Sequence, residues 1–141
     1  MKSTVLVILQ FSMIAVIITT GCFPKTVAAL ALLVAGCGLG VVSLVYIRLD
    51  NLRIFPEPKK NIRLVTTGPY KFVRHPMYVS VLLLSASFVA ESHSFVSLPA
   101  WFILLCVLLE KIRIEETLLS HLLPEYGEYK KRTWRLIPFL F

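Results

Sequence analysis

Long apolar runs separated by short polar segments dominate this 141-residue chain. Two of the runs, residues 4–20 and 26–47, contain no charged side chain. A helix that crosses a bilayer needs about 20 apolar residues, and inside lipid it satisfies its own backbone hydrogen bonds. The two runs therefore predict two membrane-spanning helices. The short link between them, residues 21–25, predicts that they form an antiparallel hairpin.

The first run has a second interpretation, as a cleaved signal. Lys2 precedes it and a small residue stands before Cys22, as in secretory and lipoprotein signals. The stretch Thr19-Thr20-Gly21-Cys22 lacks the aliphatic residue that is usual three positions before a lipidated cysteine. We expect an uncleaved span, with the signal as the alternative.

Two further apolar runs follow. Residues 76–90 form the third, and residues 95–109 form the fourth, which continues as a charged helix to residue 123. The third run is short for a span, so these two are expected as a tight helical hairpin that tilts or thins the bilayer. The tail, residues 124–141, predicts a short amphipathic helix that contains Tyr126 and Tyr129. The basic triplet at residues 130–132 and Trp134 then suit a membrane interface.

The chain is thus predicted to be a single all-α integral membrane domain over residues 1–141, with about four transmembrane helices. Residues 1–47 are expected to form a helical hairpin and residues 48–75 a cytoplasmic loop. Residues 76–141 are expected to form the half that carries most of the candidate site.

The distribution of charge predicts the orientation. Only 16% of the residues are charged, against about 25% in soluble domains, and the net charge is +7. With four spans, Lys2, the basic segment 48–75 and the tail fall on one side and Lys25 on the other. Cytoplasmic segments carry the excess of Lys and Arg, so both termini and the site are expected in the cytoplasm. Because the basic residues lie between apolar runs, we expect them at lipid headgroups and expect no nucleic-acid partner.

The three cysteines, Cys22, Cys37 and Cys106, are isolated and lie in or beside apolar runs. Their odd count without a Cys-x-x-Cys pair is typical of neither a disulfide framework nor a zinc site. We interpret them as small apolar residues and expect no metal.

Polar residues gather before the third run, where Arg74-His75-Pro76-Met77-Tyr78 follows the turn signal Gly68-Pro69-Tyr70. Proline suits the first position of a helix, and a helix start presents free N–H groups and a partial positive charge. Such a start binds anions such as carboxylates, and Tyr78 projects close to it. The simpler alternatives are that His75 only caps the helix and that Arg74 only sits at the headgroup level.

A second polar group lies on the charged extension of the fourth run and comprises Glu110, Lys111, Arg113, Glu115 and Glu116. By helical spacing, both Glu115 and Glu116 fall along apolar faces. Ionisable groups near membrane helices are costly and are functional candidates by default. The simpler alternative pairs Glu115 with Lys111 one turn away, for about 0.2–0.5 kcal/mol. On one face of one small membrane protein, the clusters together favour a site.

Five short motifs follow one another along the second half of the chain in an order and spacing found in a known family. They are Thr67-Gly68-Pro69-Tyr70, Arg74-His75-Pro76-Met77-Tyr78, Glu115-Glu116-Thr117-Leu118-Leu119, Glu125-Tyr126-Gly127-Glu128-Tyr129 and Arg135-Leu136-Ile137-Pro138. In this order and spacing they resemble the isoprenylcysteine carboxyl methyltransferase family and its bacterial relatives, over about residues 63–138.

The resemblance implies a membrane methyltransferase that uses S-adenosylmethionine and methylates a carboxylate on a lipophilic, isoprenylcysteine-like substrate, with residues 76–141 as the cofactor-binding half. It implies that Glu115 holds the positive part of the cofactor. Independently, Arg74 and the helix start suit the carboxylate of such a cofactor. The other cofactor-lining residues that the resemblance implies are Tyr70, His75, Pro76, Met77, Tyr78 and the backbone of Leu64 and Val65.

The substrate side departs from the family. Members place an arginine one turn before the first glutamate, against the substrate carboxylate. This chain has Lys111 there, with Arg113 nearby. Lysine does not grip a carboxylate through two parallel hydrogen bonds as arginine does, which weakens the case for a carboxylate acceptor. An amine or hydroxyl acceptor would need a base, for which His75 and Glu116 are the candidates.

Other interpretations stay open. The acceptor is alternatively a phospholipid amine, a lipid hydroxyl or a small thiol, and the oligomeric state is not predicted. A membrane reductase that binds a dinucleotide and a non-enzymatic membrane subunit are the rival classes. Inside the second run, Gly36 and Gly40 share a helix face that allows close packing. A cofactor-binding Gly-x-Gly, as in related phospholipid methyltransferases, is the alternative for that stretch.

Overall fold

A computed structural model describes residues 2–47, 64–92 and 94–138, and these residues are all helical or irregular, without a strand. The helices are α1 (Lys2–Thr20), α2 (Val27–Ile47), α3 (Pro76–Ala90), α4 (Ser97–Leu122) and α5 (Tyr126–Arg132), with a short 3₁₀ helix, η1 (Gly68–Lys71). The predicted all-α class is therefore confirmed. The first part of the predicted cytoplasmic loop, residues 48–63, lies outside the described residues. It contains the basic residues Arg48, Arg53, Lys59, Lys60 and Arg63.

Two of the described helices, α1 and α2, are long and apolar enough to cross a membrane. Helix α3 has 15 residues, which corresponds to about 22 Å of helix, and it begins at Pro76 as its sequence predicts. Helix α4 has 26 residues, of which residues 97–109 are uncharged and the rest carry the charged extension. By length and composition, two spans are established as candidates, and the third and fourth stay predictions.

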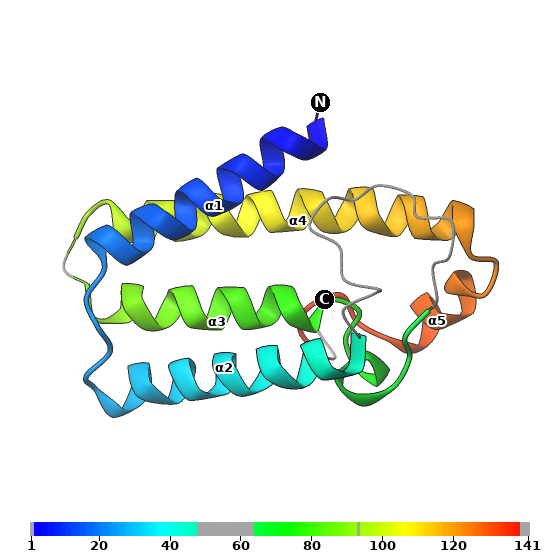
Figure 1. The fold of residues 1–141 in the computed structure, drawn as a ribbon, viewed down its shortest axis with the longest axis horizontal. Coiled ribbons are helices and arrows are strands. Elements are labelled where there is room, and N and C mark those ends of the chain that lie inside the picture. Colours follow the sequence, from blue (N-terminus) through cyan, green and yellow to red (C-terminus); the bar gives the residue numbers. More distant parts are fainter. Residues whose placement is uncertain (1, 48–63, 93, 139–141) are drawn as a thin grey trace.

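The helices pair differently from the predicted hairpins. Helix α2 packs along α3, and α1 packs across α4 (Figure 1). Helices α1 and α2 run in opposite directions, as in the predicted antiparallel hairpin, but within the described residues they pack on α4 and α3 rather than along each other. The reason lies in the link, which is tied to the end of α3. The amide of Cys22 donates to the carbonyl of Phe88 at 3.3 Å, and the Glu91 carboxylate accepts from the amide of Thr26 at 2.6 Å.

Glycines allow α2 and α3 to approach closely. The hydroxyl of Ser80 donates to the carbonyl of Gly36 at 2.7 Å, across the two helices. A Cβ atom on Gly36 would lie 2.9 Å from Leu84 Cγ, and one on Gly40 would lie 2.6 Å from Ser80 Oγ. The packing interpretation of these glycines is confirmed. This close seam fixes the start of α3 beside the end of α2.

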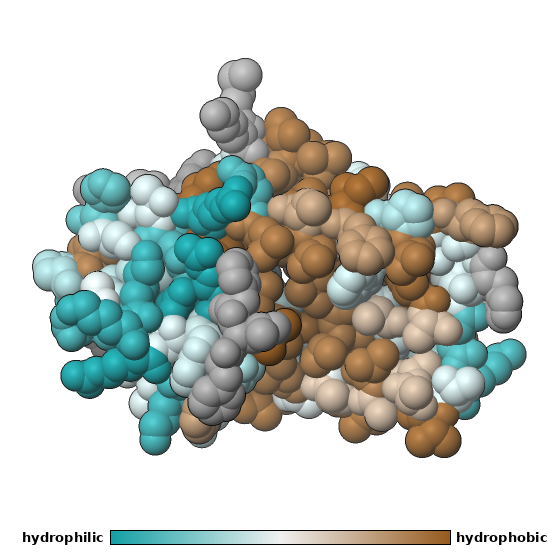
Figure 2. All heavy atoms as spheres, turned by 180° about the vertical axis from the view of Figure 1, so that it is seen from behind, coloured by the Kyte–Doolittle hydropathy of each residue, from teal (hydrophilic) through white to brown (hydrophobic). Residues whose placement is uncertain are grey.

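The core lies between α1, α3 and α4 and is built around Ile17, Ala100, Leu104 and Leu108. Trp101 satisfies its indole N–H by donating to the carbonyl of Leu82 on α3 at 3.1 Å. Much of the outer surface is apolar, including large exposed side chains on α1 and α2. Figure 2 shows a broad apolar surface over the middle of the molecule and polar side chains gathered at one end. That pattern fits a protein surrounded by lipid at its middle.

Candidate functional site

The polar end is built where the start of α3 meets the charged part of α4 and the C-terminal segment. After η1, residues 72–75 run beside residues 134–135: the amide of Arg74 donates to the carbonyl of Trp134 at 2.7 Å, and the amide of Trp134 donates to the carbonyl of Phe72 at 3.0 Å. Gly68 opens the turn with φ 61°, in the left-handed region that glycine adopts without strain. The C-terminal segment is thereby fixed against the start of α3.

Glu116 is the electrostatic centre of this end. Its side chain is 3% exposed and accepts from Arg74 Nε at 2.7 Å and from Arg135 Nε at 3.1 Å. Lys130 Nζ lies 3.8 Å away. Burial alone would raise the pKa of Glu116, but contacts with His75 and Arg74 lower it to about 2. A carboxylate that stays ionised and holds three basic side chains is suited to stabilising the fold and is a poor general base.

Arg74 is buried inside this network. In addition to its bond with Glu116, its guanidinium donates to the carbonyl of Thr133 and to the carbonyl of Lys130. These contacts do not fit the simple headgroup interpretation, because the C-terminal segment supplies backbone acceptors that the sequence pattern could not place. They engage Nε and one terminal nitrogen of Arg74, so its role in holding a cofactor carboxylate stays a prediction.

Glu115 lies beside Glu116 but has different partners. Its Oε1 accepts from the hydroxyl of Tyr78, and its Oε2 lies 3.6 Å from His75 Nδ1. The rings of His75 and Tyr78 are stacked, with centroids 5.6 Å apart and planes within 6°. His75 is buried, its side chain does not cap α3, and its Nε2 lies 3.4 Å from Glu116 Oε1. The structure thus brings together four predicted residues: His75, Tyr78, Glu115 and Glu116.

Three further tyrosines close the cluster. Tyr70, Tyr126 and Tyr129 are buried, and the Tyr129 hydroxyl donates to the carbonyl of Tyr70 at 2.6 Å. Among the described residues, the hydroxyls of Tyr70 and Tyr126 have no hydrogen-bond partner. Burial, then the neighbouring Tyr129 and Glu115, raises the pKa of Tyr70, and burial raises the pKa of Tyr129 to about 12. Burial, then the neighbouring Glu116, also raises the pKa of Tyr126, so all three hydroxyls stay protonated at physiological pH.

The short helix predicted for the tail is present as α5 (Tyr126–Arg132). It buries Tyr126 and Tyr129 against the site, a position that the amphipathic pattern alone did not predict. Their spacing of three residues places them on one face of α5, and this was the signal available in the sequence. The partner of that face was not visible from the sequence, because it is formed by η1, 59 residues earlier along the chain.

Lys111 is the fifth predicted residue in the cluster. It is 3% exposed, and its Nζ donates to Gln10 Oε1 of α1 at 2.7 Å. The ammonium lies 5.3 Å from the centre of the Tyr78 ring, within the range of a cation–π interaction. Gln10 was missed by sequence reasoning, and the only signal was a single amide within an apolar run.

The remaining predicted residues lie less centrally. Arg113 is 71% exposed and pairs with Glu110 at 3.1 Å, so the structure does not bring it to the cluster. Leu64 and Val65 are half-buried and lead into η1. Pro76 is buried at the start of α3, and Met77 beside it is half-buried.

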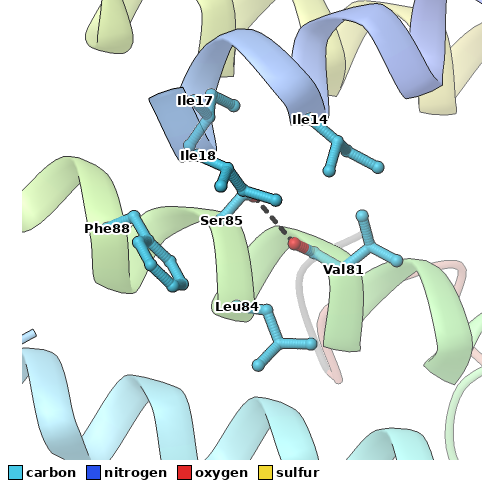
Figure 3. Close-up of a pocket in the computed structure, with 7 residues that line it drawn as sticks. All are labelled: Ile14, Ile17, Ile18, Val81, Leu84, Ser85 and Phe88. Atoms are coloured by element: carbon cyan, nitrogen blue, oxygen red, sulfur yellow. Dashed lines mark hydrogen bonds between the residues drawn. The ribbon is translucent and has the colours of Figure 1, made fainter. Parts of the chain in front are cut away.

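An apolar pocket of about 250 Å³ opens between α1 and α3 (Figure 3). The Ser85 hydroxyl donates to the carbonyl of Val81 at 2.7 Å within α3, so the wall offers almost only hydrocarbon. The lining residues are Ile14, Ile17, Ile18, Val81, Leu84, Ser85 and Phe88.

The cluster fits a sulfonium cofactor such as S-adenosylmethionine. Buried aromatic faces and the Glu115 carboxylate are groups that attract a cation. The hydroxyls of Tyr70 and Tyr126 are buried donors without a partner among the described residues, and such groups call for a ligand or a bound water. No group of three potential metal-binding side chains comes together in residues 2–47, 64–92 and 94–138.

Comparison with known proteins gives two findings. The model of the isoprenylcysteine carboxyl methyltransferase (ICMT) family matches residues 29–121. Two curated proteins are similar over 89 residues at 36% identity: the nickel-cobalt-cadmium resistance protein NccN of Alcaligenes xylosoxydans xylosoxydans and the cobalt-zinc-cadmium resistance protein CzcN of Cupriavidus metallidurans. The aligned part is 62% of this chain and 41% of each relative, so the chain spans about two fifths of the relatives' length.

Proposed function

The chain belongs to the isoprenylcysteine carboxyl methyltransferase family, and from that premise we propose that it is a membrane methyltransferase that uses S-adenosylmethionine. One observation carries the proposal: Glu115, with Tyr78 and His75, lies among buried aromatic side chains whose hydroxyls are not all satisfied. The family suggests the reaction, and this cluster supplies a place for its cofactor.

Each residue of the cluster has a distinct proposed role. Glu115 attracts the positive part of the cofactor, because its contacts are with Tyr78 and His75. Glu116, in contrast, forms ion pairs with two arginines and a lysine. Tyr70 and Tyr126 donate hydrogen bonds to polar atoms of the cofactor. The start of α3, where Met77 follows Pro76, is proposed to offer the backbone N–H of Met77 and a partial positive charge to the cofactor carboxylate, beside Arg74.

The proposed acceptor is a carboxylate on a lipophilic, isoprenylcysteine-like molecule. S-adenosylmethionine, when bound, supplies a methyl group that a nucleophile takes by in-line displacement. A carboxylate nucleophile needs no general base, which agrees with the ionised, fully engaged state of Glu116. The buried ammonium of Lys111 is the group proposed to hold the anion, and the apolar pocket between α1 and α3 is proposed to hold its chain. Catalysis then rests on positioning and charge placement.

The proposed topology has four spans with both termini and the site in the cytoplasm. The ends of α2 and α4 and the start of α3 lie at the end of the molecule that holds α5 (Figure 1). That polar end holds Arg74, Lys130 and Arg135, and the opposite end holds Lys25. An excess of basic residues favours the cytoplasmic side. A short α3 is compatible with local thinning of the bilayer.

The names of NccN and CzcN connect those proteins with resistance to heavy metals and state no chemistry. We propose that any role of this chain in such resistance proceeds through methyl transfer at the same cluster. The activity and partners of the much longer relatives do not define it, because the chain spans about two fifths of their length.

Calorimetric titration of the detergent-purified protein with S-adenosylhomocysteine tests the proposal. We expect a dissociation constant in the micromolar range, which corresponds to a binding free energy of about −8 kcal/mol. In Glu115→Gln the affinity should fall at least tenfold. Glu110→Gln is the matched control, since Glu110 lies on the same helix and is half exposed. A well-folded sample that binds no S-adenosylhomocysteine would overturn the proposal and favour a non-enzymatic membrane subunit.

A further inference from the structure

Gln10 and Lys111 form a buried polar pair between α1 and α4. Gln10 is 8% exposed and Lys111 is 3% exposed, and the amide oxygen accepts from the ammonium at 2.7 Å. Gln10 interrupts an apolar part of α1, and Lys111 is buried where the apolar part of α4 passes into its charged extension. Burying an amide and a charge in such surroundings costs free energy even when they are bonded to each other, so their presence indicates a role beyond packing.

The pair is joined to the proposed cofactor cluster. The ammonium of Lys111 lies over the face of Tyr78, and the Tyr78 hydroxyl donates to Glu115. Gln10 therefore reaches the cluster through one intermediate side chain. Gln10 also lies outside residues 29–121, which match the family, so the family pattern does not include it.

The apolar pocket begins one helical turn from this pair. Ile14 follows Gln10 by four residues on α1, and Val81 follows Tyr78 by three residues on α3, so each shares a face with its predecessor. An apolar chain in the pocket would therefore place an attached polar group near the ammonium. The ligand chemistry that fits both features is an amphiphile with an anionic end.

We infer that Gln10 is a positioning residue of the methyl-acceptor site, whose side-chain carbonyl holds the Lys111 ammonium against Tyr78 and so fixes where the anionic group of an amphiphilic acceptor binds. The inference rests on the proposed function and adds to it a residue from outside the family match. A neutral carbonyl suits this role, because it orients the ammonium without cancelling its charge. A carboxylate at the same place would hold the ammonium equally well and neutralise it.

This difference between an amide and a carboxylate provides the test. The probes are N-acetyl-S-farnesylcysteine, which carries a carboxylate, and its methyl ester, which does not. Calorimetry in detergent is expected to show that the wild-type protein binds the acid at least tenfold more tightly than the ester. In Gln10→Glu this preference is expected to fall to about twofold or less while ester binding is retained. A residue with a purely structural role would leave the preference unchanged in Gln10→Glu.

Two further variants complete the design. Gln10→Leu should weaken acid binding about tenfold by releasing the ammonium, and Thr19→Val, an exposed position on the same helix whose hydroxyl bonds only to its own helix, should match the wild type. The inference is overturned if the wild type does not prefer the acid or if Gln10→Glu keeps the preference. Parallel titration with S-adenosylhomocysteine separates the two proposals. Its binding fails if the proposed function is wrong, and it persists if only the role of Gln10 is wrong.

Discussion

The two ends of the helical assembly use carboxylates in different ways. At the end where α2 begins, Glu91 accepts hydrogen bonds from the amides of Lys25 and Thr26, and bonds from Thr26 hold its pKa below the ordinary value. Those contacts satisfy the two backbone amides that directly precede α2. At the other end, Glu116 is also fully engaged, but Glu115 and the hydroxyls of Tyr70 and Tyr126 are not explained by the fold alone.

The difference separates structural polar groups from binding groups. A polar side chain that stabilises a fold finds its partners within the chain, and burial without partners is costly. Buried donors without a partner among the described residues therefore support the proposal that the site end is the one that binds a ligand. The two adjacent glutamates show the same division within two residues of sequence.

The largest expected effect is a loss of stability at the site end, where the C-terminal segment is held by Arg74. Arg74→Met removes the bonds from the guanidinium to Glu116 and to the carbonyls of Lys130 and Thr133. Breaking a buried ion pair costs about 3–5 kcal/mol, so the melting temperature in detergent should fall steeply and the C-terminal segment should become sensitive to protease. Arg113→Met, at an exposed pair, should change stability by no more than about 0.5 kcal/mol. Equal melting of the two variants would contradict this account of the C-terminal segment.

The next effect concerns pH. The pKa of Glu116 is lowered to about 2 in the folded protein, so its contribution to stability is complete above the ordinary value of 4.5. It is lost progressively as the pH falls from 4.5 towards 2, because the unfolded chain then binds the proton more readily. Melting curves between pH 6 and pH 3 should show this fall. Glu128→Gln should retain the slope and Glu116→Gln should flatten it, and parallel slopes in all three proteins would exclude Glu116 as the cause.

A smaller effect sharpens the distinction between binding and structural hydroxyls. Tyr126→Phe removes a hydroxyl that has no partner among the described residues, so stability should be unchanged or slightly higher, while the affinity for S-adenosylhomocysteine should fall about fivefold. Tyr129→Phe removes the bond to the carbonyl of Tyr70 and should cost about 1 kcal/mol of stability, with little loss of affinity. The reverse pattern, measured by melting and calorimetry, would show that the two roles are exchanged.

The smallest effect lies at the opposite end. Glu91→Ala removes the acceptor for the two amides that precede α2, so the melting temperature should fall slightly. The affinity for S-adenosylhomocysteine should not change, because this residue lies at the far end of α3 from the cluster. A loss of affinity would show that the two ends are coupled through α3.

Most of the helices could be predicted from the sequence, because apolar runs and prolines define them locally. The start of α3 at Pro76 is the clearest case, since proline fixes the backbone at the first helical position. Which helices pack against each other was harder to predict from the sequence. The link after α1 was expected to close a hairpin, but the amides of Cys22 and Thr26 bond to the end of α3 instead. Such contacts join residues more than 60 positions apart, and no local pattern encodes them.

The candidate site was predicted where its residues share one motif and missed where they come from distant segments. His75, Tyr78 and Glu115 were named from the motifs, and the structure brings them together. Gln10 lies in a segment whose sequence indicates only membrane contact. Tyr126 lies in one of the ordered motifs, but the motif gave it no role in the site, and both roles depend on helices that pack from elsewhere. Arg74 was correctly placed near the site, but its partners are backbone carbonyls, which have no sequence signature.

The division of labour between Glu115 and Glu116 is the central claim, and thermal melting with and without S-adenosylhomocysteine tests it most directly. Glu116→Gln should lower the melting temperature of the ligand-free protein, because it weakens the contacts with Arg74 and Arg135. Glu115→Gln should melt close to the wild type without ligand and lose the rise in melting temperature that the ligand produces. The claim is contradicted if Glu115→Gln keeps that rise, or if both variants lose stability equally.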